Sequence, residues 1–137
     1  MKILRAALFY FAVIFGLGFL LGTVRVLWGA RALGETAFIL IEVPVMLAAS
    51  WLAARWLVRR YEVRSLAAAV AMGTLAFVLL MGAELLLASG LSGQAPAAWF
   101  AGLWHAPHLY GTLGQLAFAM MPVAAREKAL SQQGSIR

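Results

Sequence analysis

The chain has 137 residues, of which 64% are hydrophobic and only 12% are charged, and its mean hydropathy is +0.91. This composition lies outside that of soluble globular domains and indicates a membrane protein with a single transmembrane domain over residues 1–137. The net charge of +6 does not indicate a nucleic-acid partner, because the basic residues flank apolar runs, and the absence of cysteine excludes disulfides and thiol chemistry.

Four long apolar runs follow one another along the chain. Each is near or above the roughly 18 to 20 residues that a helix needs to cross a hydrocarbon core about 30 Å thick. The sequence therefore predicts an all-α integral membrane protein, a bundle of four transmembrane helices, followed by a mobile tail at 131–137. The predicted spans are 6–24, 35–57, 65–89 and 108–125.

The first run has a second interpretation. It follows a basic start that contains Lys2 and Arg5, and Ala30-Arg31-Ala32 has the form of a signal-peptide cleavage site. However, the apolar stretch 6–24 is longer than the core of about 7 to 15 residues in a typical signal peptide. We therefore favour an uncleaved first helix.

Small residues mark one stripe of this first helix. Gly18, Gly22 and Arg25 fall on the same face, and the spacing of the two glycines is one that permits close packing between transmembrane helices. Arg25 is therefore predicted to point toward neighbouring helices and not toward lipid.

Polar side chains within the runs gather toward their outer ends. Arg25 lies at the outer end of the first run, and Glu42 and Glu84 lie about 10 Å and about 6 to 8 Å below the outer ends of theirs. An ionised carboxylate that faces lipid costs at least about 2.5 to 3.5 kcal/mol, so both should face the bundle, with Arg25 as counter-ion of one of them. The predicted polar pocket for an ion or ligand comprises Arg25, Glu35, Glu42, Glu84, His108, Thr112 and Gln115.

Pro44 stands two residues after Glu42 inside the second run. Proline has no N–H to bond the carbonyl of Leu40, so a helix kink is predicted there. Such a kink would open space beside the carboxylate, which is tolerated in a membrane only where protein or a water-filled cavity covers it.

Two histidines, His105 and His108, lie near the outer entrance. Together with Glu42 and Glu84 they form a mixed nitrogen and oxygen set, but their spacing matches no established metal signature. They are weak candidates for a metal site, and no cofactor is predicted.

The segment 90–107 separates the third and fourth runs, and its Gly, Ser, Gln and Pro residues prevent a crossing. Trp99, Phe100, Leu103 and Trp104 recur in it at helical spacing and predict a short helix. Tryptophan is generally enriched at membrane interfaces, which favours an interfacial anchor on the outer side. The alternative is a lid over a site that faces outward.

Basic residues predict the orientation, because Lys and Arg in short loops are retained on the cytoplasmic side. They lie before the first run, around the second loop and after the fourth run. The predicted location is a bacterial inner membrane, with both termini cytoplasmic. These residues are Lys2, Arg5, Arg55, Arg59, Arg60, Arg64, Arg126, Lys128 and Arg137.

Several segments resemble uncharacterised small four-span inner-membrane proteins of bacteria. The likeness covers the first three runs and is poor after Ser89. It implies a four-span fold and a role for Arg25, Glu35, Glu42 and Glu84, but no activity, because that family has none assigned. The segments are Gly22-Thr23-Val24-Arg25-Val26-Leu27-Trp28, Gly34-Glu35, Glu42-Val43-Pro44-Val45-Met46, Ala53-Ala54-Arg55 and Ala83-Glu84.

Two classes of function remain open on the sequence. The favoured one is a non-enzymatic membrane component or subunit in which Arg25, Glu42 and Glu84 form a structural network. The alternative is a small transporter or a protein that handles ions or protons through Glu42 and Glu84. The inner half has Ser50 and Thr74 as its main polar residues, which disfavours a continuous pore.

An enzyme is the least favoured class, because no nucleophile with an adjacent base can be assembled from these residues. The predicted partner is the lipid bilayer, and association with a second copy of the chain or with another membrane protein stands beside a monomer as an open alternative. The mass of the intact protein in mild detergent would test that association.

Overall fold

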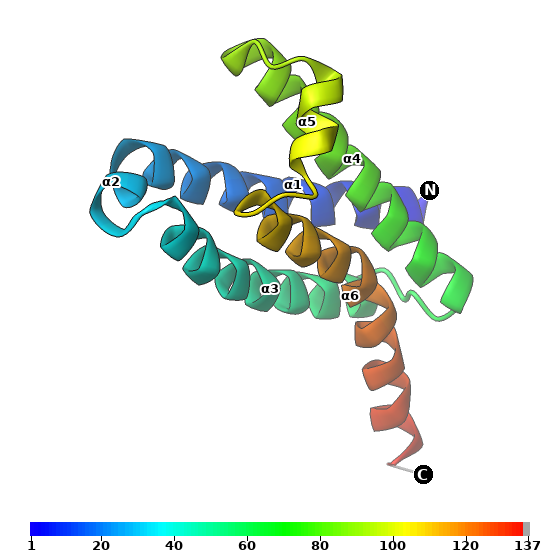
Figure 1. Cartoon of the computed structure of the whole chain (residues 1–137). Helices are drawn as coiled ribbons and strands as arrows, with labels where there is room; N and C mark the ends of the chain where they lie inside the picture. Colours follow the sequence, from blue (N-terminus) through cyan, green and yellow to red (C-terminus); the bar gives the residue numbers. More distant parts are fainter. Residues whose placement is uncertain (136–137) are drawn as a thin grey trace.

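The described chain consists of helices joined by short connections. The computed structural model describes residues 1–135, and within them there is no strand (Figure 1). The all-α class is therefore confirmed. The long helices are α1 (Lys2–Val24), α3 (Glu35–Arg60), α4 (Leu66–Ser92) and α6 (His108–Gly134), and the short ones are the π-helix η1 (Arg25–Gly29), α2 (Ala30–Leu33) and α5 (Pro96–Gly102).

Three helical segments of the described chain are long and apolar enough to cross a membrane: Lys2–Leu33, Glu35–Arg60 and Leu66–Ser92. The helix α6, which contains the predicted span 108–125, has sufficient length but is not among them. Its hydropathy is lowered by Gln115 and by the charged residues at 126–128. The structure is thus compatible with a membrane protein, and the fourth crossing stays a prediction.

The helices extend beyond the predicted spans. The segment Lys2–Leu33 has 32 residues, equivalent to about 48 Å of helix, so it is longer than a hydrocarbon core of about 30 Å. At the other end of the chain, residues 131–134 of the predicted mobile tail belong to α6, and residues 136–137 lie outside the described part.

Local sequence signals explain where the helices end. Ser65 is the N-cap of α4, and its Oγ accepts a hydrogen bond from the Ala68 N–H at 3.1 Å. The same helix ends at Gly93, which has the left-handed backbone conformation (φ 63°) common at helix C-termini. Gly34 (φ 83°) separates α2 from α3 and reverses the chain, so that α1 and α3 lie side by side (Figure 1).

The four long helices form a ring. The helix α1 packs against α3 and α4, and α6 packs against the same two helices, so α1 and α6 face each other across the centre. Lys2 Nζ lies 3.8 Å from Glu62 Oε2, and Arg59 Nη2 donates to Gln132 Oε1 at 2.9 Å. The start of α1, the connection from α3 to α4 and the last turns of α6 therefore meet at one end, which we call the basic end.

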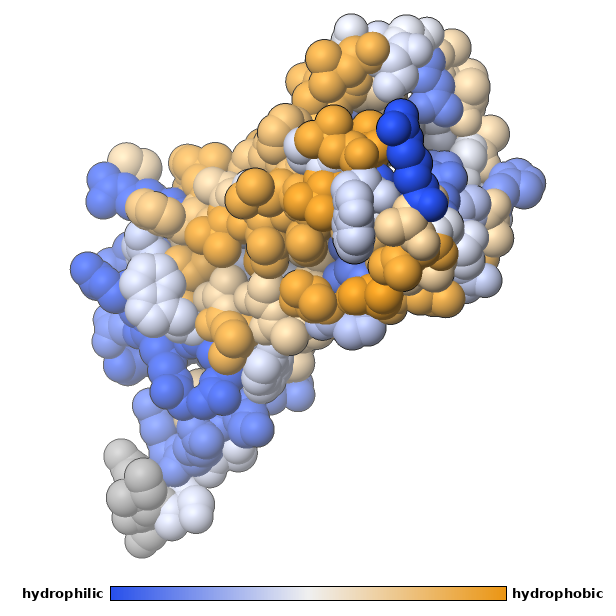
Figure 2. Space-filling view, turned by 90° about the vertical axis from the view of Figure 1, so that its left-hand side faces the viewer, coloured by the Kyte–Doolittle hydropathy of each residue, from blue (hydrophilic) through white to orange (hydrophobic). Residues whose placement is uncertain are grey.

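Polar side chains gather at the basic end of the bundle. At the basic end, Arg126 Nε donates to the Arg64 carbonyl at 2.8 Å, and Arg64 Nη2 donates to Glu62 at 3.0 Å. Figure 2 shows hydrophilic side chains gathered toward the C-terminal end of the chain, hydrophobic ones over the middle of the visible face, and further hydrophilic ones at the opposite end. Many large apolar side chains are exposed along the helices, which is compatible with a membrane protein.

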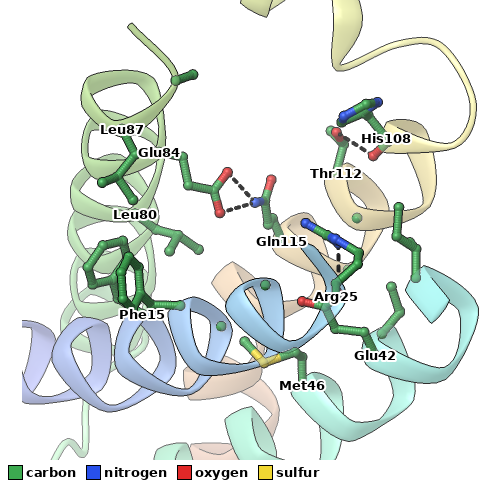
Figure 3. A pocket seen from close by; sticks show the side chains of 18 of the residues that line it. Phe15, Arg25, Glu42, Met46, Leu80, Glu84, Leu87, His108, Thr112 and Gln115 are labelled. Carbon is green, nitrogen blue, oxygen red and sulfur yellow. Dashed lines mark hydrogen bonds and ion pairs between the residues drawn. The ribbon is translucent and has the colours of Figure 1, made fainter. Parts of the chain in front are cut away.

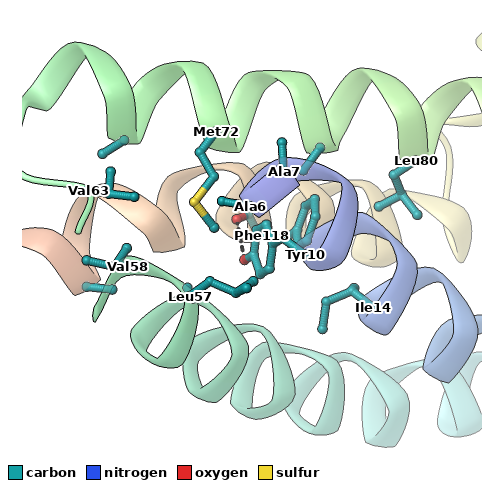
Figure 4. Packing of buried hydrophobic residues seen from close by; sticks show 14 residues of the cluster. Ala6, Ala7, Tyr10, Ile14, Leu57, Val58, Val63, Met72, Leu80 and Phe118 are labelled. Atoms are coloured by element: carbon teal, nitrogen blue, oxygen red, sulfur yellow. Dashed lines mark hydrogen bonds between the residues drawn. The ribbon is translucent and has the colours of Figure 1, made fainter. Parts of the chain in front are cut away.

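The hydrophobic core fills the half of the bundle next to the basic end (Figure 4). Tyr10 of α1, Leu57 of α3 and Met72 of α4 are completely or almost completely buried, and Phe118 of α6 joins them. Side chains therefore block the centre of the ring at this level. The other members of the core are Ala6, Ala7, Ile14, Ala54, Val58, Val63, Ala69, Ala76, Leu80 and Ala125.

A hydrogen bond connects the first and last helices inside this core. Pro122 lies inside α6 and has no N–H for the carbonyl of Phe118, four residues earlier. Tyr10 Oη donates to that carbonyl at 2.9 Å, and the Tyr10 and Phe118 rings stack with their centroids 4.3 Å apart. The Tyr10 hydroxyl of α1 therefore donates the hydrogen bond that Pro122 cannot donate to the Phe118 carbonyl within α6.

We expect Tyr10→Phe to destabilise the bundle by about 1 to 3 kcal/mol, because it leaves the buried Phe118 carbonyl without a donor. The measurement is the apparent unfolding temperature in mild detergent. In a Pro122→Ala background the restored backbone N–H bonds the same carbonyl, so Tyr10→Phe should cost clearly less there. Equal losses in the two backgrounds would contradict this role of the hydroxyl.

Candidate functional site

A cavity of about 590 Å³ occupies the half of the bundle opposite the basic end (Figure 3). All four long helices contribute to its wall, together with η1 and α5. Its lining includes Ile14, Ser50, Leu80 and Phe118, which are buried at the boundary with the core. The cavity is therefore closed toward the basic end.

Most of the lining is apolar. Phe15, Met46, Leu80 and Leu87 extend from three helices into the space drawn in Figure 3. Gly18 also lines it, and a Cβ there would lie 3.3 Å from Met46 Cε, so the small residue widens the cavity instead of bringing two helix backbones together. An apolar wall with a few polar groups is typical of small-molecule sites.

The first polar group in the cavity is an ion pair. Arg25 Nη1 donates to Glu42 Oε2 at 2.8 Å, and the side chains are 30% and 13% exposed. The sequence left open whether Arg25 pairs with Glu42 or with Glu84, and in the structure it forms its ion pair with Glu42. Arg25 is the first residue of η1, where the Ala30 N–H bonds the Arg25 carbonyl, and such π-helical turns occur frequently at functional sites.

The second polar group joins α4 to α6. Gln115 Nε2 donates to both carboxylate oxygens of Glu84, each at 2.7 Å (Figure 3). Gln115 Oε1 is buried and has no hydrogen-bond partner within the described residues. The hydrogen-bond partner of the Glu84 carboxylate is therefore a neutral amide, and the Oε1 atom of this amide is an acceptor without a donor.

Two further predicted residues, Thr112 and His108, also line the cavity. Thr112 Oγ1 donates to the Leu103 carbonyl at 2.9 Å, and the His108 carbonyl lies 3.3 Å from the same oxygen. Thr112 thereby fixes the start of α6 to the segment after α5. His108 is the exposed first residue of α6.

Glu35 and His105 do not line the cavity, contrary to expectation for Glu35. Glu35 shares a helix face with Glu42 but stands seven residues earlier, about 10 Å farther from the basic end, at the exposed start of α3. His105 Nδ1 lies 2.9 Å from the Ala101 carbonyl, which can only accept, so this nitrogen donates. Within residues 1–135 no group of three His, Asp or Glu side chains could hold a metal ion, so the weak metal hypothesis gains no support.

The sequence predicts that Pro44 kinks its helix and thereby opens space beside Glu42. Pro44 lies inside α3, which is continuous from Glu35 to Arg60, so the proline does not end the helix. Its side chain is exposed, and Pro44 is not among the residues of α3 that line the cavity, which are Ile39, Glu42, Val43, Met46 and Ser50. The kink predicted at Pro44 therefore stays a prediction.

The short helix expected between the third and fourth long helices is present as α5. Trp99 is 9% exposed and lines the cavity with Leu103, whereas Phe100 and Trp104 are 53% and 64% exposed. One face of this segment thus covers the cavity, as in the lid interpretation, and the other faces outward. The spacing of Trp99 and Leu103 by four residues was the signal in the sequence for this inner face.

Comparisons with known proteins do not assign a function, since no protein family, no curated protein and no solved structure matches this chain. The resemblance to small four-span bacterial proteins therefore stays a prediction.

Proposed function

We propose that the protein is a non-enzymatic component of a bacterial inner membrane that crosses it four times and binds a small molecule in its outer half. The observation that carries the proposal is the cavity of about 590 Å³, which falls within the range of about 300 to 1,000 Å³ of small-molecule sites. Its polar groups, Arg25, Glu42, Glu84 and Gln115, converge on a largely apolar space. A purely structural network would not need such a space.

The path of α6 supports a fourth crossing. It begins beside Leu103 at the level of the cavity and reaches Arg59 through Gln132, so it covers the same depth as α3. The basic end corresponds to the cytoplasmic side under the positive-inside rule, which puts both termini in the cytoplasm and the cavity on the outer side. The proposed partners are lipid and either a second copy or another membrane protein.

A small transporter is the second candidate. It is favoured by Glu84, whose contact is a neutral amide and which takes part in no ion pair of the described chain. It is opposed by the core between the cavity and the basic end, where Tyr10, Leu57 and Met72 leave no continuous passage. Transport would require α1, α3 and α4, which carry these residues, to separate.

Cysteine labelling tests the proposal, since the chain contains no cysteine of its own. With a membrane-impermeant reagent applied from outside, Gln94→Cys and Met46→Cys should react, and Tyr61→Cys should react only from the cytoplasm. Leu52→Cys is the matched control on α3, because Leu52 is 65% exposed but lies outside the cavity lining and should face lipid.

Reaction of Tyr61→Cys from outside would overturn the proposed orientation. An unreactive Met46→Cys, in a protein whose Gln94→Cys reacts, would show that the cavity is not accessible to water and would overturn the binding proposal.

A further inference from the structure

We infer that the cavity binds an organic ammonium ion, a molecule with an apolar body and one positively charged nitrogen that carries N–H groups, with this nitrogen between Glu84 and Gln115. The inference rests on the proposed function and specifies the class of ligand.

The charges in the cavity favour a cation. Arg25 is balanced by Glu42, with which it forms its ion pair at 2.8 Å. Glu84 adds a second carboxylate, so the lining carries a net charge of one negative when His108 is counted as neutral. An uncompensated carboxylate away from bulk water is unfavourable, and a ligand with a single positive charge would neutralise it.

The hydrogen-bond requirements favour a nitrogen with several N–H groups. A carboxylate offers about four acceptor positions, of which Gln115 Nε2 occupies two. The buried Gln115 Oε1 is a further acceptor without a partner in the described chain. The groups at this point of the cavity therefore need donors, and an ammonium group supplies up to three of them.

The rest of the lining favours an apolar body. Phe15 of α1 and Leu80 and Leu87 of α4 lie on the Glu84 side of the cavity (Figure 3). A small inorganic cation prefers six or more oxygen ligands, which this mostly apolar wall does not provide. A molecule with an apolar body and one ammonium group matches both parts of the lining.

A neutral arrangement is the competing explanation. If Glu84 is protonated, its hydroxyl can donate to Gln115 Oε1 after a turn of the amide, and the acid and the amide then satisfy each other. The cavity would in that case have no excess negative charge. It should then bind an uncharged molecule as well as it binds a cation.

Three molecules that share one rigid apolar body distinguish these explanations: adamantan-1-amine, adamantan-1-ol and adamantane-1-carboxylate. Binding to the full chain in lipid nanodiscs is measured by calorimetry, with empty nanodiscs as reference. We expect the amine to bind at least about tenfold more tightly than the alcohol, because only the ammonium group carries a charge opposite to that of the Glu84 carboxylate and donates up to three hydrogen bonds. The carboxylate should bind most weakly.

Glu84→Gln should remove the preference for the amine, because the variant has no carboxylate at this point of the cavity to compensate the ammonium charge. This variant is expected to fold, because the introduced amide can accept from Gln115 Nε2 and donate to Gln115 Oε1. Glu35→Gln is the matched control, since it removes the same charge from a residue outside the cavity, and it should retain the preference.

Equal affinities for amine and alcohol, or a preference for the carboxylate, would overturn the inference and leave the proposed function standing. Failure of all three to bind while Met46→Cys reacts from outside would also overturn the inference alone. Failure of all three with an unreactive Met46→Cys would remove the proposed function as well.

Discussion

Gly73→Ala is expected to destabilise the bundle strongly, although alanine is normally the better helix former by about 1 kcal/mol. A Cβ at Gly73 of α4 would overlap the backbone carbonyl of Ala119 in α6, and Pro122 Cδ would lie 3.6 Å from it. A carbonyl inside a helix cannot change rotamer to make room, so α4 and α6 would have to separate within the core. Overpacking of this kind costs about 1 to 3 kcal/mol and sometimes more.

The yield of monodisperse protein in mild detergent and its apparent unfolding temperature measure this effect. Gly82→Ala is the matched control on the same helix, because nothing lies within 4 Å of a Cβ at that position. We expect the control to be neutral or slightly stabilising. If both variants were equally stable, the close approach of α4 and α6 at Gly73 would be absent from the native bundle.

Arg25→Ala should destabilise the half of the bundle that contains the cavity by about 2 to 3 kcal/mol, less than the roughly 3 to 5 kcal/mol for a fully buried pair, because Arg25 is 30% exposed. The Glu42 carboxylate, 13% exposed, loses its only ion-pair partner in the described chain. Glu42→Gln should also destabilise, because it leaves the guanidinium without its counter-ion. Thermal unfolding of the two single variants and the double variant gives the coupling energy of the pair.

The double variant should lose less than the sum of the two single losses, because each single change removes the same interaction. Arg31→Ala serves as control, since Arg31 of α2 is exposed and takes part in no ion pair of the described chain. Strict additivity would show that Arg25 and Glu42 do not stabilise each other in the membrane.

The sequence was sufficient to predict those features that depend on helical periodicity and on the free-energy cost of placing a charged side chain in lipid. The apolar runs predicted an all-α chain, and the expense of a lipid-facing carboxylate placed Glu42 and Glu84 inside the bundle, where both line the cavity. Glu35 shows the limit of this reasoning. The helical period gives the direction of a side chain, but its contacts also depend on where the neighbouring helices end.

Glycine spacing was ambiguous for a similar reason. Gly18 and Gly22 were expected to permit close packing of helices, and both line the cavity. The close approach of backbones occurs at Gly73, which has no partner glycine four residues away. A small side chain permits either a contact or an open space, and only the position of the facing helix decides between them. The contact of Tyr10 with Phe118 could not be predicted from the sequence either, because it joins residues 108 positions apart.

That long-range hydrogen bond has a consequence for the order in which the bundle assembles during synthesis. The last long helix, α6, has two features that oppose entry into lipid: the Gln115 side chain and the Phe118 carbonyl that Pro122 deprives of its donor. Each is met by a helix synthesised earlier, Gln115 by Glu84 of α4 and the carbonyl by Tyr10 of α1. We therefore expect the proposed fourth crossing to depend on the earlier helices. In that case α6 would insert only after α1 and α4, and a chain truncated before α6 would leave Tyr10 and Glu84 without these hydrogen-bond partners.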